Sequence, residues 1–250
     1  MSLKNIPIEK LDKMAAKDGS QGGKNMRPKD SSTLIILDGE PGDFKVLMGR
    51  RHMNHKFMPG KFVFPGGRVD RFDGSAPSLD ELDPNVEAHL LREMRGRPTN
   101  RRARALAMAS IRETFEEAGL FIGKKGDIKT SHQDWCAFRD LGLGPTLSHL
   151  RYIARAITPP GRPRRFDARF FVTFADQIGH RFEGELGPSN ELQELHWIGF
   201  DDARNLELPV ITKTIIDDLE KRLQDDPDLD PSIPVPFYHL VGKTFRRDLI

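Results

Sequence analysis

Between residues 30 and 225, short apolar runs alternate with segments in which apolar residues recur every three or four positions. Apolar runs bounded by turn residues are typical of buried strands. They predict strands at 32–37, 44–50, 61–64, 120–123, 152–158, 169–175 and 194–200. The helical period predicts helices at 85–95, 101–118, 201–206 and 210–223, with a further helical stretch within 131–150. Because strands and helices interleave, the pattern indicates an α/β or α+β domain.

The ends of the chain and one internal segment differ from this pattern. Residues 1–29 are polar and contain several glycines, which predicts an N-terminal tail. Residues 30–225 are predicted to form one domain, and within it residues 74–104 mix turn residues with one short helix. Residues 226–250 are rich in proline and are predicted to form a C-terminal extension that lies extended over the surface of the domain.

Composition and charge exclude several classes of protein. The 39 basic and 37 acidic residues leave a net charge of +2, so no overall attraction to nucleic acid or to an anionic membrane is expected. The single Cys136 excludes an intramolecular disulfide and a four-cysteine zinc site. No apolar run approaches the roughly 18 residues that a membrane span requires. The lysine-rich N-terminus lacks an apolar segment and the chain ends in RRDLI, so a cytoplasmic location is expected.

The stretch RETFEEAGL, residues 112–120, places three glutamates within five positions. On a helix Glu113, Glu116 and Glu117 share one face, and Arg112 lies one turn before Glu116. If that face is partly buried, the carboxylates need a proton or a cation, and a hard divalent cation such as Mg²⁺ accepts their oxygens as ligands. The alternative is a solvated acidic face that ends at Gly119.

A second segment, FVFPGGRVDRFD at residues 62–73, sets two glycines between a predicted strand and two aspartates. Glycines at a strand end allow the backbone to approach a metal or a phosphate closely. An ordinary turn at the end of a strand is the alternative.

Together the two segments resemble the box of the Nudix hydrolase family, G-x5-E-x7-R-E-U-x-E-E-x-G-U, where U is a bulky aliphatic residue. Gly67 takes the first position, and Asp73 stands where the family has glutamate. The residues from Arg112 to Leu120 fill the closing half, with Phe115 at an aliphatic position. The resemblance implies an α/β/α sandwich with a mixed β-sheet, an insertion in the box loop and an extended C-terminal segment.

The chain departs from the family pattern in its spacing. Between Asp73 and Arg112 lie 38 residues instead of seven, so residues 74–104 are interpreted as an insertion within the box. Arg92 and Glu93, in LLREMRG, imitate the start of the box without its acidic pair and are interpreted as surface charges. The long gap and the segment ITPPGRPRRFDARFF resemble the peroxisomal coenzyme A and acyl-CoA diphosphatases and their bacterial relatives.

Roles for individual residues follow from this resemblance. It implies that Mg²⁺ or Mn²⁺ is bound by Glu113, Glu116, Glu117 and the carbonyl of Gly66, with Gly67, Asp73 and Gly119 supporting the motif. Arg112, which would orient a glutamate, belongs to the catalytic set with Glu116 and Glu117. A further acidic residue from a loop before the last strand often completes the family's site. Glu191 is the preferred candidate, and the others are Glu194, Glu183 and Glu185.

The basic residues Arg50, Arg164 and Arg165 are candidates for binding substrate phosphates, with Arg51 and Lys61 as similar choices. Each is otherwise an ordinary solvated charge. The implied activity is hydrolysis of a nucleoside diphosphate derivative, with CoA or acyl-CoA as the preferred substrate and ADP-ribose, NADH or another such derivative as alternatives. A Nudix-fold regulator that binds such a ligand without cleaving it is a further hypothesis. The expected partner is therefore a small molecule, with neither nucleic acid nor membrane, and a homodimer is possible.

Overall fold

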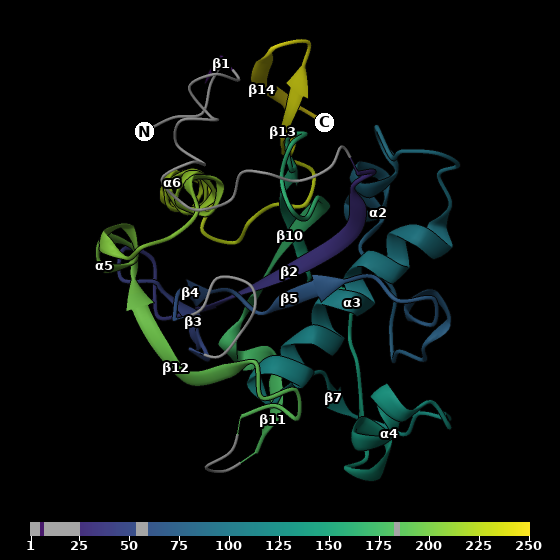
Figure 1. The fold of residues 1–250 in the computed structure, drawn as a ribbon. Coiled ribbons are helices and arrows are strands. Elements are labelled where there is room, and N and C mark those ends of the chain that lie inside the picture. The colour runs from purple at the N-terminus through teal and green to yellow at the C-terminus, as the bar shows by residue number, and fades with distance from the viewer. Residues whose placement is uncertain (1–5, 8–25, 54–59, 183–185) are drawn as a thin grey trace.

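The computed structural model describes residues 6–7, 26–53, 60–182 and 186–250. Ten of the described strands form one sheet (Figure 1). Its order is β1 (Ile6–Pro7), β14 (Thr244–Leu249), β13 (Pro236–Val241), β9 (Arg151–Ile157), β10 (Phe166–Phe174), β2 (Lys29–Asp38), β3 (Lys45–Arg51) and β12 (Leu192–Gly199), with β4 (Phe62–Val63) paired to β3 and β5 (Gly66–Arg68) paired to β2. The pairs β10–β2 and β13–β9 are parallel and the other pairs are antiparallel, so the predicted mixed sheet is confirmed.

Helices cover both faces of this sheet, because alternate residues of its central strands are apolar on both sides. On β2, Leu34 and Ile36 belong to one buried cluster, whereas Ile35 and Leu37 belong to the other. The first cluster includes residues of α2 (Pro84–Leu91), α3 (Asn100–Ala118) and α4 (Gln133–Asp140), and the second includes residues of α5 (Phe200–Asn205) and α6 (Val210–Asp225). The predicted α/β/α sandwich is therefore confirmed. None of the described helices has the length and apolar character that crossing a bilayer requires.

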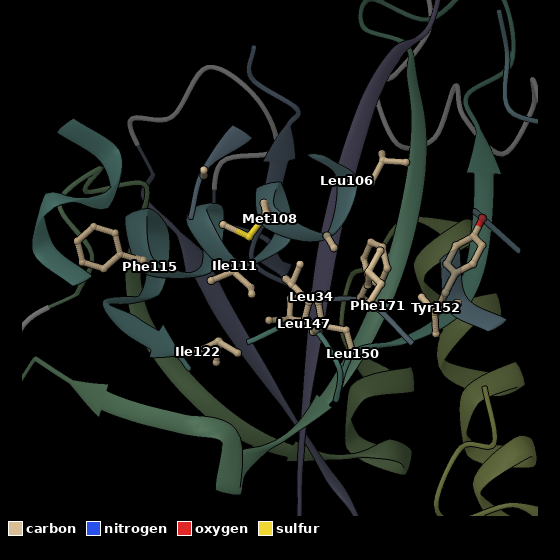
Figure 2. Close-up of a cluster of buried hydrophobic side chains, with 14 of the residues drawn as sticks. Leu34, Leu106, Met108, Ile111, Phe115, Ile122, Leu147, Leu150, Tyr152 and Phe171 are labelled. Atoms are coloured by element: carbon tan, nitrogen blue, oxygen red, sulfur yellow. The ribbon is translucent and has the colours of Figure 1, made fainter. Parts of the chain in front are cut away.

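The helix that carries the glutamates, α3, is buried along most of its length. Met108, Ile111 and Phe115 pack in the same cluster as Leu34 and Phe171 of the sheet (Figure 2). The Thr99 hydroxyl accepts a hydrogen bond from the Arg102 amide at 3.3 Å and caps the N-terminus of the helix. At the other end Gly119 has a φ of 68° and ends the helix, as the sequence indicates. The position of the glutamates is thus fixed by the core of the domain.

The inserted segment 74–104 is part of the folded domain. It contains η1 (Asp73–Ser75) in part and α2, and it contributes apolar side chains to the cluster around α3: Ala76, Leu82, Val86, Leu90, Met94 and Ala103. The predicted helix at 85–95 is shorter than expected, because the chain turns away at Glu93, whose φ is 52°. Arg92 and Glu93 are exposed, which confirms that they are surface charges.

Short strands complete the fold beside α4, and apart from β6 the sequence pattern did not predict them. β6 (Leu120–Ile122), within the predicted strand at 120–123, pairs with β11 (Ile178–Arg181) next to η2 (Ala175–Gln177). β7 (Lys124–Lys125) pairs with β8 (Leu143–Gly144). These segments are too short for an alternation of apolar and polar residues to be visible.

The C-terminal segment was predicted to lie extended over the surface, and this prediction is wrong. Residues 236–249 form the hairpin β13–β14, and β13 joins the main sheet beside β9. The two residues between the strands are Gly242, with a φ of 60°, and Lys243. Tyr238 and Phe245 enter the core on the α6 side of the sheet. Alternating apolar residues around a two-residue turn with glycine were a hairpin signal that the high proline content obscured.

Candidate active site

The glutamates of α3 face β5, the strand that follows Pro65. Gly67 lies so close to Glu113 that a Cβ on Gly67 would be 2.3 Å from the Glu113 carboxyl carbon. A Cβ at this position would therefore displace the Glu113 carboxylate from its place against β5. The two halves of the box, separated by the insertion, meet here.

Arg112 is the centre of the site and is only 3% exposed. Its Nη1 donates to Glu113 Oε1 at 2.9 Å and to Glu116 Oε2 at 3.1 Å. Its Nη2 donates to the Arg68 carbonyl at 2.8 Å. One guanidinium thus fixes two of the three glutamates and ties them to β5.

Asp73 occupies the other side of the same guanidinium. Its Oδ1 accepts from Arg112 Nε at 2.9 Å and its Oδ2 from Arg112 Nη2 at 3.1 Å. Asp73 is 1% exposed, and Oδ2 also accepts from the Asp70 amide at 2.7 Å. The shorter aspartate therefore reaches the arginine at the position where the family has glutamate, and the box loop is folded around it.

Glu117 is held by different groups. Its Oε2 accepts from the Gly66 amide at 3.1 Å, and its Oε1 lies 3.9 Å from Arg51 Nη1. Arg51 also donates to the carboxylate of Glu191. Arg51, one of the less favoured candidates from the sequence, therefore links Glu117 to Glu191.

The loop before β12 brings Glu191 to this place. The amide of Ser189 donates to the Glu116 carbonyl at 2.9 Å, and that of Gly187 donates to the Glu117 carbonyl at 3.3 Å. These bonds satisfy carbonyls at the C-terminal end of α3 and attach the loop there. Glu194 lies further along β12 and pairs with Arg50 and His196. The candidates Glu183 and Glu185 lie outside the described residues.

Glu113, Glu116 and Glu117 form a trio of glutamates. The electrostatics of their surroundings disfavour three charged carboxylates. Burial, reinforced by the charge of Glu116 and opposed by that of Arg112, raises the pKa of Glu113 to about 7. Burial also raises the pKa of Glu116, and it raises that of Glu117 well above its ordinary value despite the Gly66 amide. Burial alone would lower the pKa of Arg112, but Asp73 and the glutamates raise it. Arg112, the more distant Arg51 and the Gly66 amide do not compensate the three glutamates, so a further cation would be favourable here.

The donor set suits a hard divalent cation. Across the described ranges no three His, Cys, Asp or Glu side chains are arranged ready to hold a metal ion. Glu113 and Glu116 instead face Arg112, and Glu117 faces the Gly66 amide. Their oxygens are nevertheless the ligands that Mg²⁺ and Mn²⁺ prefer, and a cation bound there would stabilise the charged carboxylates that burial disfavours. The residues present therefore fit such an ion.

The three predicted substrate-binding arginines do not gather around the trio. Arg50 donates to Glu194 at 3.2 Å and to the Gly60 carbonyl at 3.3 Å. Arg165 donates to the carbonyls of Thr158 and Met26, and Arg164 precedes it just before β10. Lys29 on β2 lies opposite Phe166, the first residue of β10. Four residues further along β2, Thr33 pairs with Gly66. At the rise of a strand, the distance along β2 from Lys29 to Thr33 is about 13 Å. Arg164 and Arg165 thus lie near the first residues of β10, away from the pair Thr33–Gly66.

Gly67→Ala tests the close contact between β5 and α3. The new methyl group would displace the Glu113 carboxylate, so we expect kcat for diphosphate hydrolysis to fall by about tenfold to 100-fold. The free energy of unfolding should fall by less than about 1.5 kcal/mol, because the end of one side chain can move aside. Gly199→Ala is the matched control, since a Cβ there meets no atom within 4 Å. Unchanged kcat in Gly67→Ala would contradict a role for the position of Glu113.

Comparisons with known proteins agree with this geometry. No protein-family model matches the chain. It is 28% identical over 167 residues to nudix hydrolase 7 of Caenorhabditis elegans. This match covers 62% of this chain and 46% of that protein. It is 32% identical over 97 residues to the acyl-coenzyme A diphosphatase NUDT19 of Xenopus laevis, covering 32% of this chain and 26% of that protein. The matches thus span less than half the length of these curated relatives.

A solved structure extends the likeness to the fold. The NUDIX hydrolase from Alicyclobacillus acidocaldarius is 25% identical, with a TM-score of 0.58, and the match covers 77% of this chain and 90% of that one. The box residues, their assembly around Arg112 and these likenesses all support a relationship of the chain to the Nudix hydrolase family.

Proposed function

We propose that the protein hydrolyses the diphosphate linkage of a nucleoside diphosphate derivative. The observation that carries this proposal is the trio Glu113, Glu116 and Glu117, which is packed against β5 although burial raises the pKa of all three. A face that crowds like charges in this way costs stability, and a protein that only folds has no need of it. A diphosphate with a divalent cation provides the charge balance that the trio requires.

In this mechanism Glu113, Glu116, Glu117 and the Gly66 carbonyl would hold Mg²⁺ or Mn²⁺. When bound, such an ion neutralises phosphoryl oxygens and lowers the pKa of water. Arg112 keeps Glu113 and Glu116 in fixed rotamers through the hydrogen bonds described above, and Asp73 keeps Arg112 in place. Because these side chains are held before substrate arrives, little reorganisation is required during the reaction.

Glu191 is the proposed general base. Its carboxylate lies at Arg51, the same guanidinium that approaches Glu117, and its side chain is 36% exposed. It can therefore reach both the buried glutamate and a water molecule from solvent. Arg51 would keep this carboxylate oriented, which a proton acceptor requires.

CoA or acyl-CoA is the proposed substrate. Water adds across the P–O–P bridge, one fragment takes the oxygen and the other the proton, and the products are 3′,5′-ADP and phosphopantetheine or its acylated form. The name of the Xenopus laevis relative and the long insertion within the box support this choice.

A substrate panel tests the proposal. Purified protein is incubated with CoA, an acyl-CoA, ADP-ribose and NADH in Mg²⁺ or Mn²⁺, and the products are separated by chromatography. We expect release of 3′,5′-ADP from CoA or acyl-CoA. Turnover of ADP-ribose or NADH alone would overturn the choice of substrate and leave the reaction class standing. Tight binding of a nucleotide without any turnover would overturn the reaction and favour a ligand-binding regulator.

A further inference from the structure

A cavity of about 440 Å³ opens between the first residues of β2, the loop after β5 and the first turns of α3. Its lining includes five basic residues, Lys29, Arg68, Arg71, Arg101 and Arg102, and two acidic ones, Asp30 and Asp70. Since the whole chain has a net charge of only +2, this surplus of cations is local. We call it the basic cavity.

One acidic residue of the basic cavity is already neutralised. Asp30 Oδ2 accepts from Arg102 Nη2 at 2.9 Å, and Asp30 Oδ1 accepts from Arg169 Nη1 at 3.0 Å. Arg102 Nη1 donates to the carbonyls of Arg95 and Arg97, each at 2.8 Å. Arg102 and Asp30 therefore form the fixed wall of the basic cavity.

The other four cations are not used within the fold. Among the residues that the structure describes, the side chains of Lys29, Arg68, Arg71 and Arg101 form no ion pair or hydrogen bond, and all four are exposed. Asp70 alone opposes them. Four solvated cations around one concavity provide the charge and the donors that a phosphate group requires.

The basic cavity adjoins the glutamate site. Arg68, on its wall, follows Gly67, which contacts Glu113. Gly74 of the box loop packs against Arg101, since a Cβ on Gly74 would be 2.8 Å from both Arg101 Cγ and the Arg101 carbonyl oxygen. Along α3, the eight positions from Ala105 in the basic cavity to Glu113 correspond to about 12 Å. One extended small molecule can therefore reach both places.

We infer that the basic cavity binds a phosphate monoester that the substrate carries in addition to the diphosphate that is cleaved. This inference rests on the proposed function and specifies its substrate class. CoA has such a group, the 3′-phosphate on its ribose, whereas dephospho-CoA lacks it. The residues concerned are Arg71, Arg101 and Lys29 rather than Arg164 and Arg165, the candidates from the sequence.

The test compares CoA with dephospho-CoA in wild type and in the double variant Arg71→Gln/Arg101→Gln. We expect the double variant to lower kcat/KM for CoA by about tenfold to 30-fold, mainly through KM, and to leave that for dephospho-CoA unchanged. Lys125→Gln/Arg246→Gln, which removes two exposed charges outside the basic cavity, is the matched control and should change neither value. An equal effect on both substrates, or no effect on either, would overturn the inference.

A binding measurement keeps the inference testable if neither compound is hydrolysed. Calorimetric titration with 3′,5′-ADP and 5′-AMP, both without metal, should show tighter binding of 3′,5′-ADP to wild type by about tenfold. The double variant should bind the two nucleotides equally. Equal binding by wild type overturns the basic cavity as a phosphate site, and hydrolysis of diphosphates by the glutamate site would be unaffected by that result.

Discussion

Glu116→Gln is expected to lower kcat for diphosphate hydrolysis by about 10³-fold. The substitution keeps the size of the side chain and an acceptor for Arg112 Nη1, but it removes one of the charges that would hold the divalent cation. Loss of a preorganised charged group at a reacting centre reduces rates by about 10²–10³-fold. Steady-state assays with the substrate from the panel, at saturating Mg²⁺, measure this effect.

The same variant should not unfold more easily. Burial, together with the charges of Asp134 and Asp73, raises the pKa of Glu116 despite Arg112, so its ionised form is disfavoured in the folded state. We expect the free energy of unfolding of Glu116→Gln at pH 7.5, in EDTA, to equal or exceed that of wild type. Glu40→Gln, on the exposed turn between β2 and β3, is the control for removal of a carboxylate. Activity close to that of wild type in Glu116→Gln would contradict the proposed role of the trio.

The local part of the site could be predicted from the sequence because it depends on helix geometry. The spacing of Glu113, Glu116 and Glu117 sets them on one face, and Arg112 is within reach of Glu116 at i+4. Gly119 ends the helix for a reason that is also local, its positive φ. Both features need only the residues of one element.

Contacts between segments that are far apart in the sequence were harder to predict. The pair Arg112–Asp73 spans the insertion, and only the resemblance to the box indicated that the two residues belong together. Arg50 and Arg51 are neighbours on β3, and the sequence favoured Arg50. Alternation along a strand points successive side chains to opposite faces, so only one of the two can approach Glu117, and the structure shows that it is Arg51. The choice between faces depends on the register of β3 in the sheet, which a sequence does not give.

The basic cavity was not predicted for a related reason. Its cations come from β2, β5, the box loop and α3, segments that are separated in the sequence. In the sequence they are ordinary surface charges. Only packing of the insertion and α3 beside β5 gathers them in one place.

A second group of buried charges, on β9 and β10, contributes to stability rather than to the proposed chemistry. Asp167 on β10 accepts from Arg155 Nε and Nη2, each at 2.8 Å, and its Oδ1 lies 2.8 Å from Arg169 Nη1. All three side chains are at most 1% exposed. Burial alone would lower the pKa of Arg155, but Asp167 raises it. The carboxylate is therefore what allows the guanidinium to remain buried and charged.

Arg155 also joins parts of the chain that are far apart in sequence. Its Nη1 donates to the carbonyl of Glu93 in the insertion at 2.9 Å, and its guanidinium lies 4.2 Å from the ring centroid of Phe237 on β13. The insertion and the C-terminal hairpin, the two segments that the pattern of residues described least well, thus both contact one side chain of β9, in addition to their core packing and the pairing of β13 with β9. A defect at Asp167 should loosen both.

Asp167→Asn is accordingly expected to lower the free energy of unfolding by about 3–5 kcal/mol, because it leaves two buried guanidiniums with the half-buried Asp30 as the remaining carboxylate near them in the described part of the chain. Asparagine keeps the shape of the side chain, so the loss reports the charge rather than a cavity. Urea unfolding at pH 7.5 measures the difference, with Asp176→Asn, on the exposed η2, as the control. A loss below about 1 kcal/mol would mean that the buried arginines are compensated by other groups and that Asp167 does not attach the two segments to the sheet.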